Sequence, residues 1–145
     1  RMYENMAAYW PTVDGSAPDV EVEFARAWKR LPKIVFSTTL EQVAWNSVLA
    51  RAVIPEEIEA LKAQPGGDID LGGADLAATF IRLGLVDEYR LYVHPVVLGG
   101  GTPMFPPGET LRLRLVETRT FRCGVVLLRY LSAATTRESN PQTNV

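Results

Sequence analysis

Two adjacent glycines, Gly72 and Gly73, follow a short apolar segment at 69–71 and precede a segment with the apolar spacing of a helix. A strand that leads through glycines into a helix start leaves backbone N–H groups free, and these groups and the positive helix end both attract an anion. The pattern therefore predicts a phosphate site in which Gly73 and Ala74 present their N–H groups. The alternative is a tight strand-to-helix turn that needs glycine for steric reasons alone.

Asp75 adds a constraint to this prediction, because it lies in the first turn of the expected helix. A carboxylate in that position is favoured by the helix dipole, but it would repel a bound pyrophosphate if it pointed inward. We therefore expect Asp75 to point outward or to cap the helix.

A second polar cluster, Ser37, Thr38 and Thr39, follows an apolar segment that is typical of a buried strand. Its three hydroxyl groups and three N–H groups suit a ribose or a phosphate; alternatively, they only turn or cap the chain. In mostly parallel sheets, ligands bind beyond the carboxyl ends of the strands. The strand ends that meet this description lie at 37–39, 72–74 and 93–95.

His94 is the only histidine, and it stands at the third of these strand ends. It either lines a substrate pocket or is a hydrogen-bonded structural residue. No metal site is expected, because one His and one Cys cannot form a Cys/His site and no carboxylates have the spacing of a calcium loop. There is no G-x-S-x-G elbow, and Cys123 lies in a β-patterned region where a small core or turn residue is expected. The sequence therefore nominates no catalytic side chain.

Helical and strand patterns alternate along the chain and must position these groups. Helical patterns occupy 1–10, 55–63 and the segment from Gly73 to Gly84, and 24–30 is a short helical or irregular segment. Strand patterns occupy 33–37, 50–53, 69–71, 89–93, 111–121 and 125–131. This order predicts a three-layer α/β fold: a mostly parallel central sheet, helices on both faces, and a C-terminal antiparallel hairpin at the sheet's edge.

The composition points to a small globular protein. The chain has 145 residues, of which 47% are hydrophobic and 22% charged, and its net charge is −2. This charge gives no reason to expect a nucleic acid or a membrane as partner. No apolar run approaches the roughly 18 residues of a spanning helix, and a single cysteine fits a reducing compartment. We expect a cytoplasmic protein that binds a small-molecule substrate.

The two ends of the chain differ in pattern. The first ten residues, from Arg1, already have the spacing of a helix, whereas 134–145 is polar and contains proline. We expect one domain over 1–133 that lacks its N-terminal strand and helix, followed by a disordered tail at 134–145.

Three segments together resemble the C-terminal reductase domain of bacterial riboflavin biosynthesis, a member of the dihydrofolate reductase-like fold. They are KIVFSTTL (33–40), LGGADLAATFIRLGLVDEYRLYVHPVVLGGGTPMF (71–105) and GVVLLRY (124–130). The opening RMYENMAAYW also resembles the helix that follows that family's G-R-x-T/M-Y-E motif. The resemblance runs from Arg1 to about Ser132, and it implies an NADPH-dependent reductase.

The resemblance also implies where the cofactor and the substrate lie. Ser37, Thr38 and Thr39 would lie by the adenosine ribose and its 2′-phosphate, and Arg1 stands within the opening cofactor motif. The residues that would surround the pyrophosphate are Gly72, Gly73, Ala74, Asp75 and Leu76. His94 and Pro95 would lie near the ring-binding end of the pocket, on the substrate side.

By this resemblance, the protein transfers a hydride from NADPH to a pyrimidine, a pteridine or a similar heterocycle, or to a ribosylaminopyrimidine, as 5-amino-6-(5-phosphoribosylamino)uracil reductase does. The chain has no H-x-E with P-C-x-x-C zinc signature, so we expect no attached deaminase, and this expectation favours a paralogue with a different substrate. The alternatives are a non-catalytic nucleotide-binding or sensor protein on the same fold, and an oligomeric scaffold.

The run of four apolar residues at 125–128 is more apolar than a hairpin with one solvated face requires. A homodimer would cover this run. The alternative is a helix of the same chain.

Overall fold

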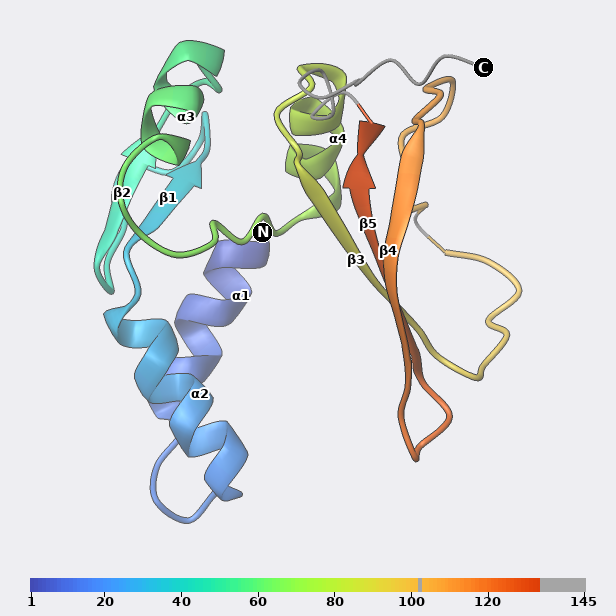
Figure 1. The fold of residues 1–145 in the computed structure, drawn as a ribbon. Helices are drawn as coiled ribbons and strands as arrows, with labels where there is room; N and C mark the ends of the chain where they lie inside the picture. The colour runs from blue at the N-terminus through green and yellow to red at the C-terminus, as the bar shows by residue number, and fades with distance from the viewer. Residues whose placement is uncertain (102, 134–145) are drawn as a thin grey trace, which may run out of the picture. The chain divides into compact units, whose positions relative to one another are not determined.

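In the computed structural model, residues 1–101 and 103–133 are described, and the tail predicted at 134–145 lies outside them. The chain has a mixed α/β fold with two compact units, Arg1–Leu76 and a second that begins at Ala77 (Figure 1). The single domain expected over 1–133 stays a prediction.

The first unit combines helices with a two-stranded parallel sheet. Its elements are α1 (Met2–Tyr9), the 3-10 turn η1 (Trp10–Thr12), α2 (Asp19–Arg30), β1 (Lys33–Phe36), β2 (Ser47–Ala50) and α3 (Pro55–Lys62). Helix α4 (Ala74–Arg82) begins in this unit and continues into the second. None of the helices in the described residues is long and apolar enough to span a membrane.

Aromatic rings pack α1 and the η1 turn that follows it against α2, and the two helices lie side by side in Figure 1. The rings of Tyr3 and Trp28 have centroids 6.4 Å apart, and those of Trp10 and Phe24 are 4.4 Å apart. The Tyr3 hydroxyl also donates to Ala44 O and accepts from Ala44 N, at 3.0 and 2.8 Å. These contacts attach α1 both to α2 and to the segment between the two strands.

Helix α2 is longer than the helix predicted at 24–30. It begins at Asp19, directly after Pro18, and its first turn carries Asp19 and Glu21, where carboxylates stabilise the positive end of the helix. Its buried residues, Ala25 and Trp28, are three positions apart and therefore lie on the same face of the helix. The Gly, Pro and Ser residues just before it made this start resemble a loop in the sequence.

Lys33 joins the end of α2 to the start of β1. Its Nζ donates to Trp28 O at 2.6 Å and to Leu31 O at 2.7 Å, and it lies 4.6 Å from the centroid of the Trp28 ring. The last carbonyls of a helix lack partners within the helix, so this ammonium group satisfies one of them. Burial lowers the pKa of the Lys33 ammonium group below its usual value.

Strands β1 and β2 pair in parallel, with Lys33 opposite Ser47 and Phe36 opposite Ala50. The strand predicted at 50–53 is therefore wrong in its bounds: β2 begins three residues earlier and ends at Ala50. The turn into β2 contains Trp45 and Asn46, both with positive φ (58° and 54°), a conformation that the sequence did not indicate.

The strand predicted at 69–71 is not formed, and Ile69 is 56% exposed. This short segment contains Asp70 and follows Asp68, and aspartate is disfavoured in strands. Among the described residues, parallel pairing is confined to β1 and β2, and the larger sheet is antiparallel. The expected mostly parallel central sheet is wrong in this respect.

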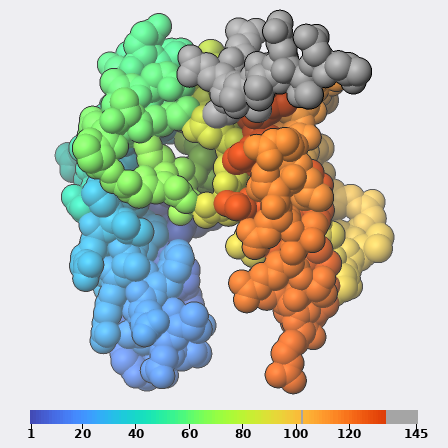
Figure 2. All heavy atoms as spheres, in the orientation of Figure 1, coloured from blue at the N-terminus to red at the C-terminus, as the bar shows by residue number. Residues whose placement is uncertain are grey.

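The second unit contains a three-stranded antiparallel sheet in the order β3-β5-β4. Its strands are β3 (Glu88–Val93), β4 (Leu113–Thr120) and β5 (Val126–Ser132). The apolar run at 125–128 leads into β5, the central strand, in which Leu127 is buried. The outer strand β4 is mostly exposed, and Figure 2 shows it in orange at the surface. A central place in the sheet thus accounts for much of this apolar run, and the homodimer stays a prediction.

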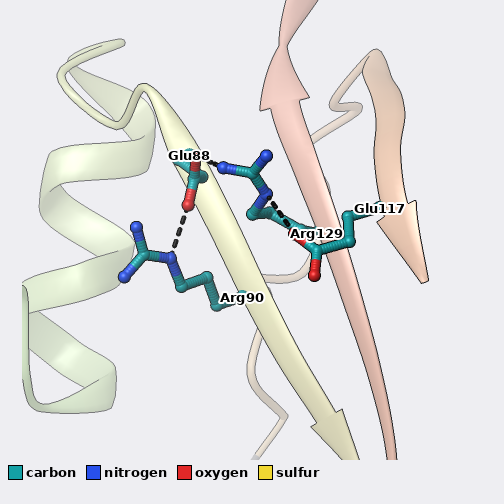
Figure 3. A network of polar contacts seen from close by, with 4 residues as sticks. All are labelled: Glu88, Arg90, Glu117 and Arg129. Atoms are coloured by element: carbon teal, nitrogen blue, oxygen red, sulfur yellow. Dashed lines mark hydrogen bonds and ion pairs between the residues drawn. The ribbon is translucent and has the colours of Figure 1, made fainter. Parts of the chain in front are cut away.

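Arg129 connects the three strands through charge (Figure 3). Its Nη1 donates to Glu88 Oε2 at 3.2 Å, and its Nε forms an ion pair with Glu117 Oε2 at 3.1 Å. Arg90 pairs with Glu88 as well. The register shifts at Val116, so that Glu117 rather than Val116 stands opposite Arg129. This bulge places a carboxylate beside the central arginine.

Helix α4 ends at Arg82, and Gly84, where the sequence predicted the stop, forms the turn that follows. Gly84 N donates to Ile81 O at 3.0 Å and Leu85 N donates to Phe80 O at 2.9 Å, which is the hydrogen-bond pattern of a Schellman motif. This motif needs a left-handed residue, and Gly84 has φ +70°. Phe80, Ile81 and Leu85 are all buried, so the turn directs apolar residues into the core on both sides.

We predict that Gly84→Ala destabilises the protein. No atom obstructs the added methyl group, so the cost is that of a left-handed alanine, about 1 kcal/mol in the free energy of unfolding. Gly66→Ala is the matched control, because Gly66 also has open space but no positive φ. Urea denaturation followed by circular dichroism should show a lower midpoint for Gly84→Ala alone; equal midpoints would contradict the prediction.

We also predict that Lys33→Met weakens the first unit. The variant keeps the aliphatic stem but loses two charge-assisted hydrogen bonds, so the free energy of unfolding should fall by about 1–2 kcal/mol. All three tryptophans, at positions 10, 28 and 45, belong to this unit, so tryptophan fluorescence reports on its unfolding. Lys29→Met is the control, since the Lys29 ammonium group lies 6.0 Å from the centroid of the Trp45 ring and makes no hydrogen bond to a carbonyl group among the described residues. A loss as large in the control would show that charge alone, and not the carbonyl contacts, matters.

Candidate functional site

A cavity of about 350 Å³ lies at the carboxyl ends of β1 and β2. The residues that line it are Phe36, Ser37, Thr38, Arg51, Ala52 and Val53. Phe36 is the last residue of β1, and Arg51 directly follows β2. The lining combines one cation and two hydroxyl groups with apolar side chains, and it contains no carboxylate.

The parallel register explains why these polar groups meet. Ser37 N donates to Ala50 O at 3.0 Å, so the ladder continues one step past β1. Arg51 Nη1 donates to Ser37 O at 3.0 Å and to Leu40 O at 2.6 Å. Arg51 therefore fastens the segment that follows β1 to the end of β2.

Ser37 shapes the turn that carries its neighbours. Its Oγ accepts hydrogen bonds from Thr39 N at 3.2 Å and from Leu40 N at 3.1 Å, and it lies 3.4 Å from Thr39 Oγ1. This is a serine turn, in which the hydroxyl replaces a backbone acceptor. Thr38, by contrast, is exposed and has no hydrogen-bond partner in the described part of the chain. Thr38 is therefore the hydroxyl of this cluster that is open to a ligand.

The two glycines lie against the start of α1. A Cβ at Gly72 would stand 3.1 Å from Met2 Cε, and Gly73 has φ +98°, which favours glycine. Helix α4 begins directly after them, at Ala74. The steric requirement for glycine is therefore met at both positions.

The structure divides the predicted cofactor residues into two places. Ser37 and Thr38 line the cavity, whereas the residues at 72–76 do not. Arg1 precedes Met2 and so lies at the same helix start as the Gly72–Gly73 pair, with its side chain exposed. The assignment of all these residues to one cofactor site stays a prediction.

His94 and Pro95, predicted on the substrate side, belong to the second unit. Val96 N donates to His94 O at 2.8 Å, and this short turn follows β3 directly. A Cβ at Gly124 would lie 3.2 Å from Pro95 Cγ, so the prolyl ring packs against the turn between β4 and β5. Their role toward a substrate stays a prediction.

Arg51 is the site residue that sequence reasoning missed. The predicted strand at 50–53 placed it in mid-strand, where its side chain had no reason to face a ligand. No local signal in the sequence could have found it, because the start of β2 at Ser47 follows two positive-φ residues, Trp45 and Asn46, whose conformation the sequence did not indicate. No group of His, Cys, Asp and Glu among the described residues could hold a metal ion.

We predict that Ser37→Ala loosens the turn at 37–40. Loss of the Oγ acceptor should cost about 1 kcal/mol per hydrogen bond, so exchange of the Thr39 and Leu40 amide protons should become about fivefold faster. Thr38→Val is the control, because it removes a hydroxyl without a partner in the described residues. If both variants exchange alike, Ser37 does not hold this turn.

Comparison with known proteins identifies a family and several relatives. The RibD C-terminal domain family matches residues 3–127. The uncharacterized protein YyaP of Bacillus subtilis (strain 168) is 46% identical over 115 residues, which is 78% of this chain and 61% of YyaP. The uncharacterized protein YwjB of the same organism is 41% identical over 70 residues, which is 46% of this chain and 40% of YwjB. The chain therefore spans less than two thirds of these relatives.

Two solved structures share the fold. A protein of Shewanella sp. PV-4 whose name assigns it to riboflavin biosynthesis has a TM-score of 0.64 and 21% identity, over 87% of this chain and 77% of its own. A pyrimidine reductase-like protein of Corynebacterium diphtheriae has a TM-score of 0.50 and 22% identity, over 83% and 56% of the two chains. The motifs at 33–40, 71–105 and 124–130 predicted this relationship from the sequence. Since the family match covers most of the chain, the protein belongs to the RibD C-terminal domain family.

Proposed function

We propose that this protein is an NADPH-dependent reductase of a pyrimidine- or pteridine-like heterocycle or of a ribosylaminopyrimidine. The observation that carries the proposal is the cavity at the carboxyl ends of β1 and β2, which is the ligand-binding edge of a parallel sheet. Membership of the RibD C-terminal domain family supports the reductase class. The matched part of the chain covers 61% of YyaP. The reductase activity of the whole protein is therefore a proposal.

The residues of the first unit fit a nucleotide cofactor chemically. Thr38 offers a hydroxyl group and Arg51 a cation at the cavity, and both suit a ribose that carries a phosphate. The Gly72–Gly73 turn precedes the start of α4, where backbone N–H groups and the helix dipole favour a pyrophosphate. Arg1 lies at the start of α1, beside this turn. We assign the adenosine end to the cavity and the pyrophosphate to 72–76.

The chemistry asks little of the protein's side chains. When bound, NADPH supplies a hydride to an electron-poor carbon of the substrate. The chain's own residues need to bind and orient the two molecules, and orientation alone can supply a large part of the rate enhancement. We place His94 and Pro95 on the substrate side, in keeping with a role in positioning. Hydride transfer needs no nucleophilic side chain, so this reaction is compatible with a sequence in which no nucleophile was predicted.

We predict saturable NADPH binding that precedes turnover. Titration with NADPH should quench the fluorescence of the tryptophans, all of which belong to the first unit. Absorbance of NADPH should then fall when 5-amino-6-(5-phosphoribosylamino)uracil or a member of a pterin panel is added. Binding without oxidation across the panel would favour a nucleotide-binding protein without turnover, and no saturable binding would remove the reductase proposal.

Two glycine variants test whether the Gly72–Gly73 turn contributes to NADPH binding. Gly73→Ala forces alanine into the positive-φ region, and the turn must shift to relieve a strain of about 1–2 kcal/mol. We therefore expect the affinity for NADPH to fall roughly tenfold, the change that about 1.4 kcal/mol produces. Gly67→Ala, with open space and no positive φ, should bind as the wild type does.

A further inference from the structure

The end of β3 and the segment that follows it carry an exposed apolar patch, which consists of Tyr92, Val93, Val96, Val97 and Leu98. The exposed fractions of these residues range from 51% for Val93 to 96% for Val97. In no other stretch of the described residues are three consecutive large apolar side chains all exposed, as they are at 96–98. Figure 1 shows the chain leaving the end of β3 and looping out beside the three-stranded sheet. An exposed apolar surface of this kind marks an interaction site in a globular protein.

The protein holds the segment that carries the patch in place. The Pro95 ring packs against the turn between β4 and β5, where a Cβ at Gly124 would lie 3.2 Å from Pro95 Cγ. Further along the chain, the Phe105 ring has its centroid 5.9 Å from that of Tyr89, which is buried. The patch is therefore exposed although its segment is attached to the sheet. A surface that is already held in place loses little conformational entropy when it binds a partner.

The patch contains no charged residue, and this limits the kinds of partner that it fits. Between Arg90 and Glu109 the chain has no Asp, Glu, Lys or Arg, although these residues make up 22% of the chain. Depletion of charge is typical of the centre of a protein–protein interface, as is the presence of tyrosine. The cavities of about 350 and 280 Å³ are lined by residues of the first unit alone, so the patch is a face for a protein and not a pocket for a small molecule.

The size of the patch fits a second copy of the same patch. The exposed fractions correspond to roughly 600 Å² of accessible surface, the upper end of the largest apolar patch on an ordinary monomer. Two such patches face to face bury about 1,200 Å², the lower end of the range for specific protein–protein interfaces. The partner must present an apolar surface of similar extent and without charge, and a second copy of this chain does so.

We infer that this patch is the contact surface of a homodimer, in which the patches of two copies face each other about a two-fold axis. This surface is distinct from the apolar run at 125–128, which leads into the central strand β5. The inference does not depend on the proposed function, because no residue of the patch belongs to the cavity at the ends of β1 and β2.

The test measures the mass of the full 145-residue chain in solution by sedimentation equilibrium, over a range of concentrations. We expect the wild type to reach twice the monomer mass of 16.0 kDa. Val97→Glu places one carboxylate from each copy in the apolar contact, so the dissociation constant of the dimer should rise by about 100-fold. Val20→Glu is the matched control, because Val20 is 72% exposed on α2 of the first unit, and this variant should dimerise as the wild type does.

A cross-linking experiment decides the question even if Val97→Glu does not fold. The background is Cys123→Ser, which removes the only cysteine of the chain. In this background, Val97→Cys should be joined to its counterpart in the second copy by a short bis-maleimide, because Val97 is the most exposed residue of the patch. Val20→Cys in the same background should give little cross-linked product.

The other outcomes would overturn the inference. A wild type that is monomeric at every concentration would assign the patch to a different protein. A dimer that survives Val97→Glu would have its interface elsewhere, and equal dissociation of Val20→Glu would show an effect of charge alone. Equal cross-linking of the two cysteine variants would mean random collision. None of these measurements involves NADPH, so the reductase proposal stands or falls separately.

Discussion

The hydrogen-bond register between β1 and β2 is the constraint on which the first unit depends. With Lys33 opposite Ser47, the next residues beyond the two strands are Ser37 and Arg51, and a hydrogen bond joins them. A slip of one residue would turn every side chain of one strand to the opposite face, and Arg51 would leave the cavity. Lys33 helps to prevent such a slip, because it fixes the first residue of β1 to the end of α2.

The sequence predicted the features that depend on local signals and missed those that depend on distant partners. Helix α3 has proline at its start, carboxylates in its first turn and Lys62 in its last, so its bounds could be predicted within a residue. The turn at Gly84 that follows α4 has an equally local reason. A strand, however, exists only where another strand pairs with it. The segment at 69–71 has no pairing in the described structure, and Asp70 was the one local sign against a strand there.

The same distinction applies to the candidate site. Ser37, Thr38 and Thr39 could be predicted because hydroxyl residues directly after an apolar strand are visible in one stretch of sequence. Arg51 could not, because its place depends on where a second strand ends. Two residues with positive φ that are not glycine, Trp45 and Asn46, set that boundary, and their conformation is enforced by contacts such as that of Asn46 Nδ2 with Arg30 O at 2.6 Å. Family membership, by contrast, could be predicted from motifs alone.

The polar groups of the cavity hold one another before any ligand arrives. The Ser37 hydroxyl accepts from two backbone N–H groups of its turn, and Arg51 donates to two carbonyl groups of the same turn. Both sets of bonds close on four residues, so the turn and the arginine restrict each other's motion. Binding to such a site costs less conformational entropy of the protein than binding that must first order a free arginine side chain. The hydroxyl cluster is thus divided by role: the Ser37 hydroxyl holds the turn, whereas the Thr38 hydroxyl has no hydrogen-bond partner among the described residues.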